Sequence, residues 1–419
     1  MNTIFVQLAS YRDPELLPTI DDMLDKAALP QNLRIGICRQ YEENDRFDNI
    51  DKYRSDSRFR IIDVPYLKSK GACWARNKIQ ALYDNEAYTL QIDSHMRFQE
   101  NWDSELIKII NDLQKSGIEK PLITGYVPSY DPENDPNGRV RVPWRMTFDR
   151  FIPEGAVFFI PEVIPGWELL DAPISARFYS AHFCFTLGEF STEVQHNPKY
   201  YFHGEEISIT VRAYTHGYDL FHLHKVLIWH EYTRKGRTKQ WDDDKDWVSK
   251  NTTSHLTNRR LFGMDGLKQS GHRGKYGFGN KRSLKDYEEY AGIRFVNRSV
   301  QEYTLSKSNP PNPPISSFES VLEWENSFLE IFKHCIDVYI GQLPESDYDF
   351  WAVAFHGSDD STMYRQDADE AEINNLLKNA DTHCKIWRAF RTSSLPAYWV
   401  VWPHSKSKGW CERIEGRII

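Results

Sequence analysis

Several features are missing from this 419-residue sequence, and each absence excludes a class of protein. No stretch approaches the ~20 consecutive apolar residues of a membrane-spanning helix, so we expect no transmembrane segment. The short apolar run from Ile4 to Ala9 lacks a preceding basic region, and we interpret it as a first strand and not as a signal peptide. No concentrated basic face accompanies the net charge of −8, which argues against a nucleic-acid partner.

The cysteines also lack a pattern. All six are scattered and none forms a CxxC pair, which is typical of reduced thiols in a cytoplasmic protein. No internal repeat is present. In contrast, 40% of the residues are hydrophobic, which is enough for sizeable cores and excludes general disorder.

The first half of the chain alternates between strand and helix patterns. Strands are expected at 3–9, 33–38, 58–64 and 88–92, and helices at 15–28, 71–83 and 102–114. This alternation predicts β-α-β units and an α/β fold with a mainly parallel sheet. Ligands of such sheets bind beyond the carboxyl ends of the strands. That rule selects four polar sites, which are Ser10 to Arg12, Cys38 to Gln40, Asp63 and Asp93 to His95.

The later sequence predicts further elements and a domain boundary. Long loops are expected at 126–164, strand-like structure at 173–187, a helix at 205–216, one strand at 220–229, and a mobile lid or connector at 235–285. Residues 301–317 are rich in proline and read as a linker. We therefore expect an α/β domain over 1–300 and a smaller, mostly β domain over 318–419.

A possible cation site closes the strand at 88–92. Asp93 and His95 lie two residues apart at the strand end, so that a carboxylate and an imidazole project to the same side. This pair suits Mn²⁺ better than Mg²⁺, which prefers oxygen ligands, although Mg²⁺ stays an alternative. The simpler interpretation is that Asp93 caps a turn and His95 is an ordinary loop histidine.

A family resemblance favours the metal site. The ordered motifs Gly71-Ala-Cys-Trp-Ala-Arg-Asn77, Tyr88 to Phe98 and Trp102-Asp103 closely resemble cytoplasmic N-acetylglucosaminyltransferases that modify hydroxyproline on Skp1, and their bacterial relatives. Ser10 to Leu16 fits the same family. The resemblance covers roughly residues 3 to 294 and does not reach the C-terminal region.

A more distant similarity is to the polypeptide N-acetylgalactosaminyltransferases, through Asp93-Ser94-His95 and Gly204 to Ile209. Together these resemblances imply a GT-A fold, a UDP-sugar donor (UDP-GlcNAc for the nearer family), a divalent cation and retention of anomeric configuration. Asp93 and His95 would be two metal ligands. The third would be His230, in Ile228-Trp-His-Glu-Tyr-Thr-Arg234, with His222 and His224 as competitors.

The same resemblance implies further contacts with the donor. Residues assigned to binding of the nucleotide sugar are Ser10, Tyr11, Arg12, Asp63, Arg76, Ser94, His182 and Arg234. The nucleobase is expected near Ser10 to Arg12, and Arg76 is expected at the diphosphate or uracil. His182 replaces a glycine of the distant relatives at the sugar pocket.

The expected catalytic carboxylates are Asp93, Glu205 and Glu206, and the sequence does not decide which glutamate contacts the substrate. The alternative is that Glu205 and Glu206 have no catalytic role, because the helix dipole by itself favours carboxylates at the start of a helix.

Alternatives stay open at this point. The acceptor is either a protein hydroxyproline or a glycan, and a polysaccharide-synthesising transferase that uses another UDP-hexose fits the same motifs. A metal-dependent hydrolase is a further candidate, for which Phe221-His-Leu-His224 is the one dense histidine motif. A pure lectin has no need for an α/β nucleotide-binding half. The second domain could hold the acceptor or build a homodimer.

Overall fold

The computed structural model describes residues 2–152, 154–271 and 274–418. Contacts between Cα atoms divide the chain into two compact units. The first comprises Met1–Val296 and Tyr303–Pro314, and the second comprises Asn297–Glu302 and Ile315–Ile419. No helix in the described ranges is both long and apolar enough to cross a bilayer.

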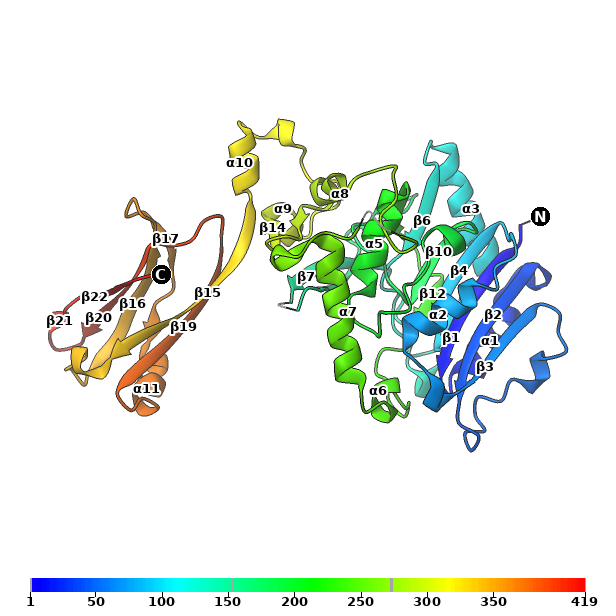
Figure 1. Ribbon diagram of the computed structural model, residues 1–419, viewed down its shortest axis with the longest axis horizontal. Coiled ribbons are helices and arrows are strands. Elements are labelled where there is room, and N and C mark those ends of the chain that lie inside the picture. Colours follow the sequence, from blue (N-terminus) through cyan, green and yellow to red (C-terminus); the bar gives the residue numbers. More distant parts are fainter. Residues whose placement is uncertain (1, 153, 272–273, 419) are drawn as a thin grey trace. The chain divides into compact units, whose positions relative to one another are not determined.

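The first unit is built on an eight-stranded sheet (Figure 1) with the order β3-β2-β1-β4-β10-β6-β11-β9. Its strands are β1 (Ile4–Tyr11), β2 (Leu33–Tyr41), β3 (Phe59–Pro65), β4 (Tyr88–Asp93), β6 (Lys120–Thr124), β9 (Ile174–Ser175), β10 (Phe183–Leu187) and β11 (Tyr218–His222). Strands β1 to β4 pair in parallel, as do β6 and β11, whereas β9 and β10 run antiparallel to their neighbours. The sheet is therefore mainly parallel, which confirms the predicted α/β class and agrees with the GT-A fold that the resemblance implies.

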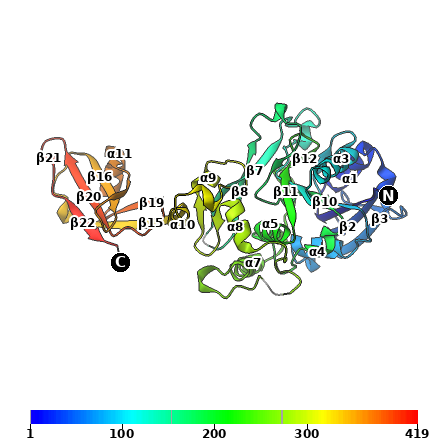
Figure 2. The same ribbon diagram turned by 90° about the horizontal axis from the view of Figure 1, so that it is seen from above.

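Helices cover both faces of this sheet. The α-helices of the first unit are α1 (Leu16–Lys26), α2 (Ala72–Gln80), α3 (Trp102–Lys115), α4 (Phe190–Glu193), α5 (Glu205–Thr215), α6 (Gln240–Asp243), α7 (Trp247–Phe262), α8 (Leu284–Ala291) and most of α9 (Glu302–Leu305). Alternation along β1 explains the layers: Ile4 and Val6 pack with α1 and α3, and Phe5 packs with α2 on the opposite face. Figure 2 shows α1 and α3 on one side of the sheet and α5 on the other.

Two short antiparallel pairs complete the first unit and correct the sequence interpretation. The predicted single strand at 220–229 is two strands, because β11 ends at His222 and β12 (Ile228–His230) pairs in a different sheet with β5 (Met96–Phe98). The region expected to be only loops contains a hairpin of β7 (Trp144–Phe151) and β8 (Val157–Val163). The segment 235–285 contains α6 and α7, so much of it is regular helix.

The proline-rich segment is divided between the two units. Residues 303–314 belong to the first unit, where Asn312 is 4% exposed. The Asn312 side chain accepts a hydrogen bond of 2.6 Å from Arg177 and donates one of 2.9 Å to Thr304. These buried contacts tie the segment to the first unit.

The second unit is mostly β. Its elements are β14 (Ser299–Gln301), α10 (Val321–Asn326), β15 (Phe328–Tyr339), β16 (Tyr348–His356), β17 (Thr362–Arg365), β18 (Ala368–Asp369), α11 (Glu370–Lys378), β19 (His383–Thr392), β20 (Tyr398–Ser405), β21 (Gly409–Trp410) and β22 (Ile414–Arg417). Inward side chains of β15, β16, β19 and β20 share one core with α11. Trp351 and Val353 are fully buried in it. The second unit therefore has a hydrophobic core of its own.

Candidate active site

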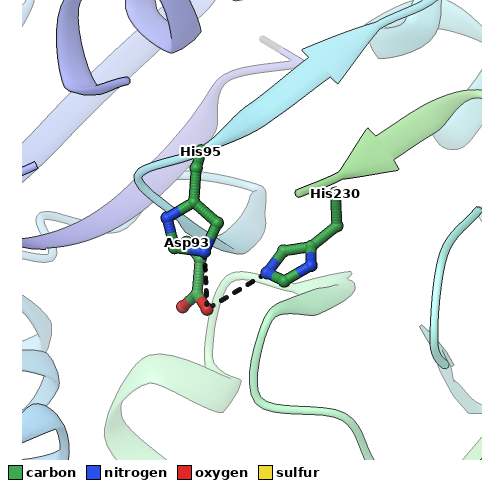
Figure 3. A group of neighbouring side chains, drawn as sticks. All are labelled: Asp93, His95 and His230. Carbon is green, nitrogen blue, oxygen red and sulfur yellow. Dashed lines mark ion pairs between the residues drawn. The ribbon is translucent and has the colours of Figure 1, made fainter. Parts of the chain in front are cut away.

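Three side chains with metal-binding chemistry meet at the carboxyl end of β4 (Figure 3). One ligand atom each of Asp93, His95 and His230 lies within 4.8 Å of the others. The Oδ2 atom of Asp93 is 3.7 Å from His95 Nε2 and 3.5 Å from His230 Nε2. One carboxylate and two imidazoles thus converge on the same point.

Strand pairing brings these residues together from distant parts of the sequence. Antiparallel pairing of β5 with β12 places His230 opposite Met96, and the N–H of Glu231 donates to the carbonyl of His95 at 3.1 Å. The hydroxyl of Thr19 in α1 holds the turn through the backbone of Ser94 and Met96. The turn after β4 is therefore fixed from two sides.

Neither ring nitrogen of His230 has a hydrogen-bond partner among the described residues, although both nitrogens are buried. A buried polar atom without a partner costs free energy unless a ligand or water satisfies it. A donor set of one carboxylate and two imidazoles fits a divalent transition metal such as Mn²⁺. The residues present therefore fit a cation.

Asp13 supports this cluster. It is 3% exposed, and its Oδ2 accepts from His95 Nδ1 at 2.8 Å and from the Ser94 hydroxyl at 2.6 Å. A histidine whose Nδ1–H donates to a carboxylate presents Nε2 as the free lone pair, which here faces Asp93. Asp13 thus orients His95, whose Nδ1 also lies against the Arg237 guanidinium.

Arginines surround the cluster. Arg76 on α2 is 6% exposed and donates to Asp93 Oδ1 at 2.8 Å, while its Nε and Nη1 atoms are buried without a hydrogen bond. The guanidinium of Arg234 lies over the rings of Phe202 and Trp241, at 5.7 Å and 5.3 Å from their centres. Both arginines line the cavity that contains Asp93. The cavity is therefore suited to an anion.

The charge state of Asp93 follows from these neighbours. Burial acts to raise its pKa, but His230, Arg76 and His95 outweigh burial and hold the pKa well below its ordinary value. Asp93 is therefore an ionised carboxylate. The same residue lines two adjoining cavities, one of about 170 Å³ and one of about 350 Å³.

The larger cavity contains the two glutamates at the start of α5. Gly204 precedes them with φ = 92°, and a Cβ there would lie 2.7 Å from Asn258, so this turn requires glycine. Glu206 accepts from the N–H of Ala181 at 2.9 Å, whereas Glu205 lies 3.7 Å from Arg76. Burial is the main cause that raises the pKa of both carboxyls, and for Glu205 the neighbouring Glu206 adds to it. Such a pair can share one proton.

His182 lines the same cavity. Its ring stacks on His230 with centres 4.3 Å apart, and its Nε2 faces the Tyr232 hydroxyl at 3.2 Å. Burial and the nearby His230 lower the pKa of His182 well below its ordinary value, so the ring is neutral. The imidazole lies on the wall of the larger cavity beside the cluster of Asp93, His95 and His230.

Of the remaining residues that the sequence predicted for the site, some line the smaller cavity and the others do not. Tyr11 and Ser94 line the smaller cavity, and the Tyr11 hydroxyl donates to Asp243 at 2.8 Å. Arg12 pairs with Asp45 and Asp243 and does not line that cavity.

Ser10 is buried at the end of β1, where its backbone carbonyl accepts from the Gln40 side chain and its hydroxyl has no hydrogen-bond partner among the described residues. Asp63 pairs with Arg39 and Arg54, at 3.3 Å and 2.7 Å. The structure does not bring Ser10, Arg12 or Asp63 to the cavity wall beside Asp93.

The competing histidines lie outside the cluster. His222 is 2% exposed, its Nδ1–H donates to the Thr124 carbonyl at 2.8 Å, and its Nε2 accepts from the Met146 N–H at 3.3 Å. His224 is also buried, and among the described residues it joins no group of metal-ligand geometry. The break between β11 and β12 separates His222 and His224 from His230.

Sequence reasoning missed two residues of the site. Asp13 lies in the turn after the first strand, and a polar residue at a strand end is a signal that the sequence displays. Its hydrogen bond to His95 becomes visible only in the folded structure. Arg237 lies in the segment interpreted as a lid or connector, pairs with Glu231 at 2.6 Å, and lines the smaller cavity. No local motif marks Arg237, because its partners are brought in by the fold.

Comparison with known proteins gives one family and several structural similarities. The chain matches the family model described as "Glycosyltransferase (GlcNAc)" over residues 3–58 and 46–297. No curated protein sequence gives a significant match.

Among solved structures, GalNAc-T7 with UDP, GalNAc and Mn²⁺ is 13% identical with a TM-score of 0.46, and the match covers 69% of this chain and 54% of that one. S. aureus TarS 1–349 in complex with UDP-GlcNAc is 11% identical with a TM-score of 0.38, over 59% of this chain and 64% of that one. The chain thus spans about half of the GalNAc-T7 chain that it matches.

Proposed function

Because the chain belongs to the GlcNAc family of glycosyltransferases, whose model matches more than half of its length, we propose that it transfers N-acetylglucosamine from UDP-GlcNAc to a hydroxyl group, with retention of configuration. The observation that carries this proposal is the convergence of Asp93, His95 and His230 beside the buried Arg76, two of whose donor atoms have no hydrogen-bond partner among the described residues. The donor assignment rests on the family description, and the metal site rests on the geometry.

In this proposal Asp93, His95 and His230 hold a divalent cation, with Mn²⁺ preferred. When bound, the cation supplies positive charge to the diphosphate of the departing UDP. Asp13 orients His95, whose Nε2 faces Asp93. The Nε2 atom of the buried His230 has no hydrogen-bond partner among the described residues and lies 3.5 Å from Asp93 Oδ2, so it is available for such a contact.

The arginines complement a diphosphate. Arg76 offers its unpartnered Nε and Nη1 donors from a buried position, where a charged hydrogen bond to phosphate is strong. Arg234, held against two aromatic rings, adds positive charge at the border between the two cavities. Tyr11, on the wall of the smaller cavity, is proposed to contact the nucleoside.

Glu205 and Glu206 are proposed to bind the hydroxyls of the donor sugar and of the acceptor in the larger cavity. Glu206 is already held by the Ala181 N–H, which suits a fixed contact with the donor sugar. Glu205 has only the longer contact with Arg76 and is the freer of the two to receive the acceptor hydroxyl. His182 limits the size of the donor sugar that fits beside them.

The experiment is a donor screen with the full chain. UDP release is measured for UDP-GlcNAc, UDP-GalNAc and UDP-glucose, with Mn²⁺, with Mg²⁺ and with a chelator. We expect the highest turnover with UDP-GlcNAc and Mn²⁺, and loss of at least ~100-fold with the chelator, because the leaving group then lacks its counter-charge. Equal turnover with the chelator would contradict the metal site, and preference for another donor would contradict the sugar assignment.

A further inference from the structure

A second large cavity lies next to the active site and is rich in lysine. Five lysines line a hollow of about 910 Å³, namely Lys68, Lys70, Lys78, Lys199 and Lys250. Its walls include apolar and aromatic side chains, among them Ile62, Trp74, Pro198 and Tyr201. We refer to it as the lysine cavity.

The positive charge of the lysine cavity is mostly not neutralised by the protein. Among the described residues, Lys68, Lys70 and Lys199 are exposed and form no ion pair, while Lys250 pairs with Asp244. The single carboxylate that lines the cavity is Asp63, which is already held by Arg39 and Arg54. Between Asp63 and Asp84 the chain carries four basic residues and no acidic one. In a chain of net charge −8, this is a local field that attracts anions.

A thin wall separates the lysine cavity from the active site. Tyr201 lines both hollows, and Lys70 lines the lysine cavity while the next residue, Gly71, lines the active site. The wall is tight here, because a Cβ on Gly71 would lie 2.6 Å from the Tyr201 carbonyl. The Ser69 hydroxyl also donates to Gln40 at 2.6 Å, which fixes the segment.

The distance to the reacting groups is short. The chain from Lys199 to Glu205 runs past both cavities of the active site, through Tyr201 and Phe202. Six residues span at most about 20 Å. The lysine cavity and the glutamates are therefore no farther apart than a polymer of a few units can span.

We propose that the lysine cavity binds the acceptor, and that this acceptor is a glycan bearing phosphate or carboxylate groups; this rests on the proposed transferase function. Ammonium groups act as hydrated point charges that suit such anions. Trp74 supplies an aromatic surface of the kind that packs against apolar faces. Lysine is depleted in protein–protein interfaces, so a protein acceptor is the less favoured ligand of this surface.

The test measures glycan binding by calorimetry with the full chain, without a donor. The probes are oligogalacturonate, which carries carboxylates, phosphomannan fragments, which carry phosphates, and neutral maltoheptaose. We expect one of the anionic probes to bind, more weakly at high salt because exposed charges are screened. Maltoheptaose should bind at least about tenfold more weakly.

The variant is the double substitution Lys68→Ser/Lys70→Ser, and the matched control is Lys115→Ser/Lys285→Ser, at exposed lysines outside the cavity. The first should lose about tenfold in affinity for the anionic probe and the control should lose none. UDP affinity and UDP-GlcNAc hydrolysis should be unchanged in both.

Equal losses in the variant and the control would overturn the proposal, as would equal binding of maltoheptaose or failure of both anionic probes. An acidic peptide or a single-stranded DNA oligomer that bound more tightly, with the same lysine dependence, would also overturn it. If the wild-type chain fails to hydrolyse any UDP-sugar, the transferase proposal fails, and the glycan titration still decides whether the cavity binds anionic glycans.

Discussion

Two buried histidines eight positions apart differ in the hydrogen bonds that their rings form. His222 at the end of β11 and His230 at the end of β12 are both buried, at 2% and 6% exposure. The ring of His222 has a backbone partner at each nitrogen, from Thr124 and Met146. The ring of His230 has no hydrogen-bond partner at either nitrogen among the described residues, and it faces Asp93.

This difference distinguishes a structural histidine from the proposed metal ligand. A buried imidazole with two satisfied nitrogens stabilises the fold and has no lone pair to offer. A buried imidazole without partners lowers stability unless something binds it, and proteins retain such groups where a ligand compensates. The same criterion applies to Arg76, whose unpartnered donors lie beside the same cluster.

The largest expected effect comes from removing the shared carboxylate. Asp93→Asn should reduce UDP-GlcNAc turnover by at least ~100-fold, because it removes the negative charge of the one carboxylate in the cluster, which also pairs with Arg76. Circular dichroism should show an intact fold, since Asp93 lies at a strand end. Near-wild-type turnover in this variant would contradict the proposal that the cluster of Asp93, His95 and His230 is required for transfer.

A smaller effect is expected at Asp13, which touches the cluster only through His95. Asp13→Asn should weaken Mn²⁺ binding in the presence of UDP by about tenfold, the low end for losing a carboxylate that orients a ligand histidine. Ser94→Ala removes another of the hydrogen bonds to Asp13 and leaves the contact with His95, so it is the matched control, with an expected change below threefold. Equal losses in both variants would mean that Asp13 only holds the turn.

The smallest effect on function is expected from removing the buried hydrogen bond between Arg177 and Asn312, because its role is structural. A fragment that ends at Pro314 should bind UDP as the full chain does, because the proposed site lies before that point. A fragment that ends at Ser308 also lacks Asn312, so Arg177 loses its 2.6 Å partner. The free energy of unfolding of that fragment should be lower by about 1–3 kcal/mol, measured by urea denaturation. If the Pro314 fragment is insoluble, the proposed boundary between the units is wrong.

Much of the first unit could be predicted because its signals are local. The alternation of apolar strands and amphipathic helices specifies the parallel sheet, and the Asp93-Ser94-His95 motif follows directly from the end of β4. The aromatic-basic run around His230 was found through the family resemblance. These features depend on neighbouring residues, which the sequence displays.

What could not be predicted depends on contacts between distant residues. Residues 220–229 are predicted to form one strand, and only the pairing of β12 with β5 divides them. The bond between Asp13 and His95 joins residues 82 positions apart. Asp63 satisfies the strand-end rule, but Arg39 and Arg54 occupy its carboxylate. Local polarity at a strand end therefore does not reveal which partner the fold supplies.

The central claim is that His230, and not His222, completes the metal site, and one titration tests it most directly. Mn²⁺ is titrated into His230→Ala and His222→Ala with UDP present, and the affinity is read by calorimetry. We predict that His230→Ala weakens binding at least ~10-fold. We predict that His222→Ala leaves the affinity nearly unchanged while its melting temperature falls, because two backbone groups lose their partner. The reverse order of affinities would contradict the account.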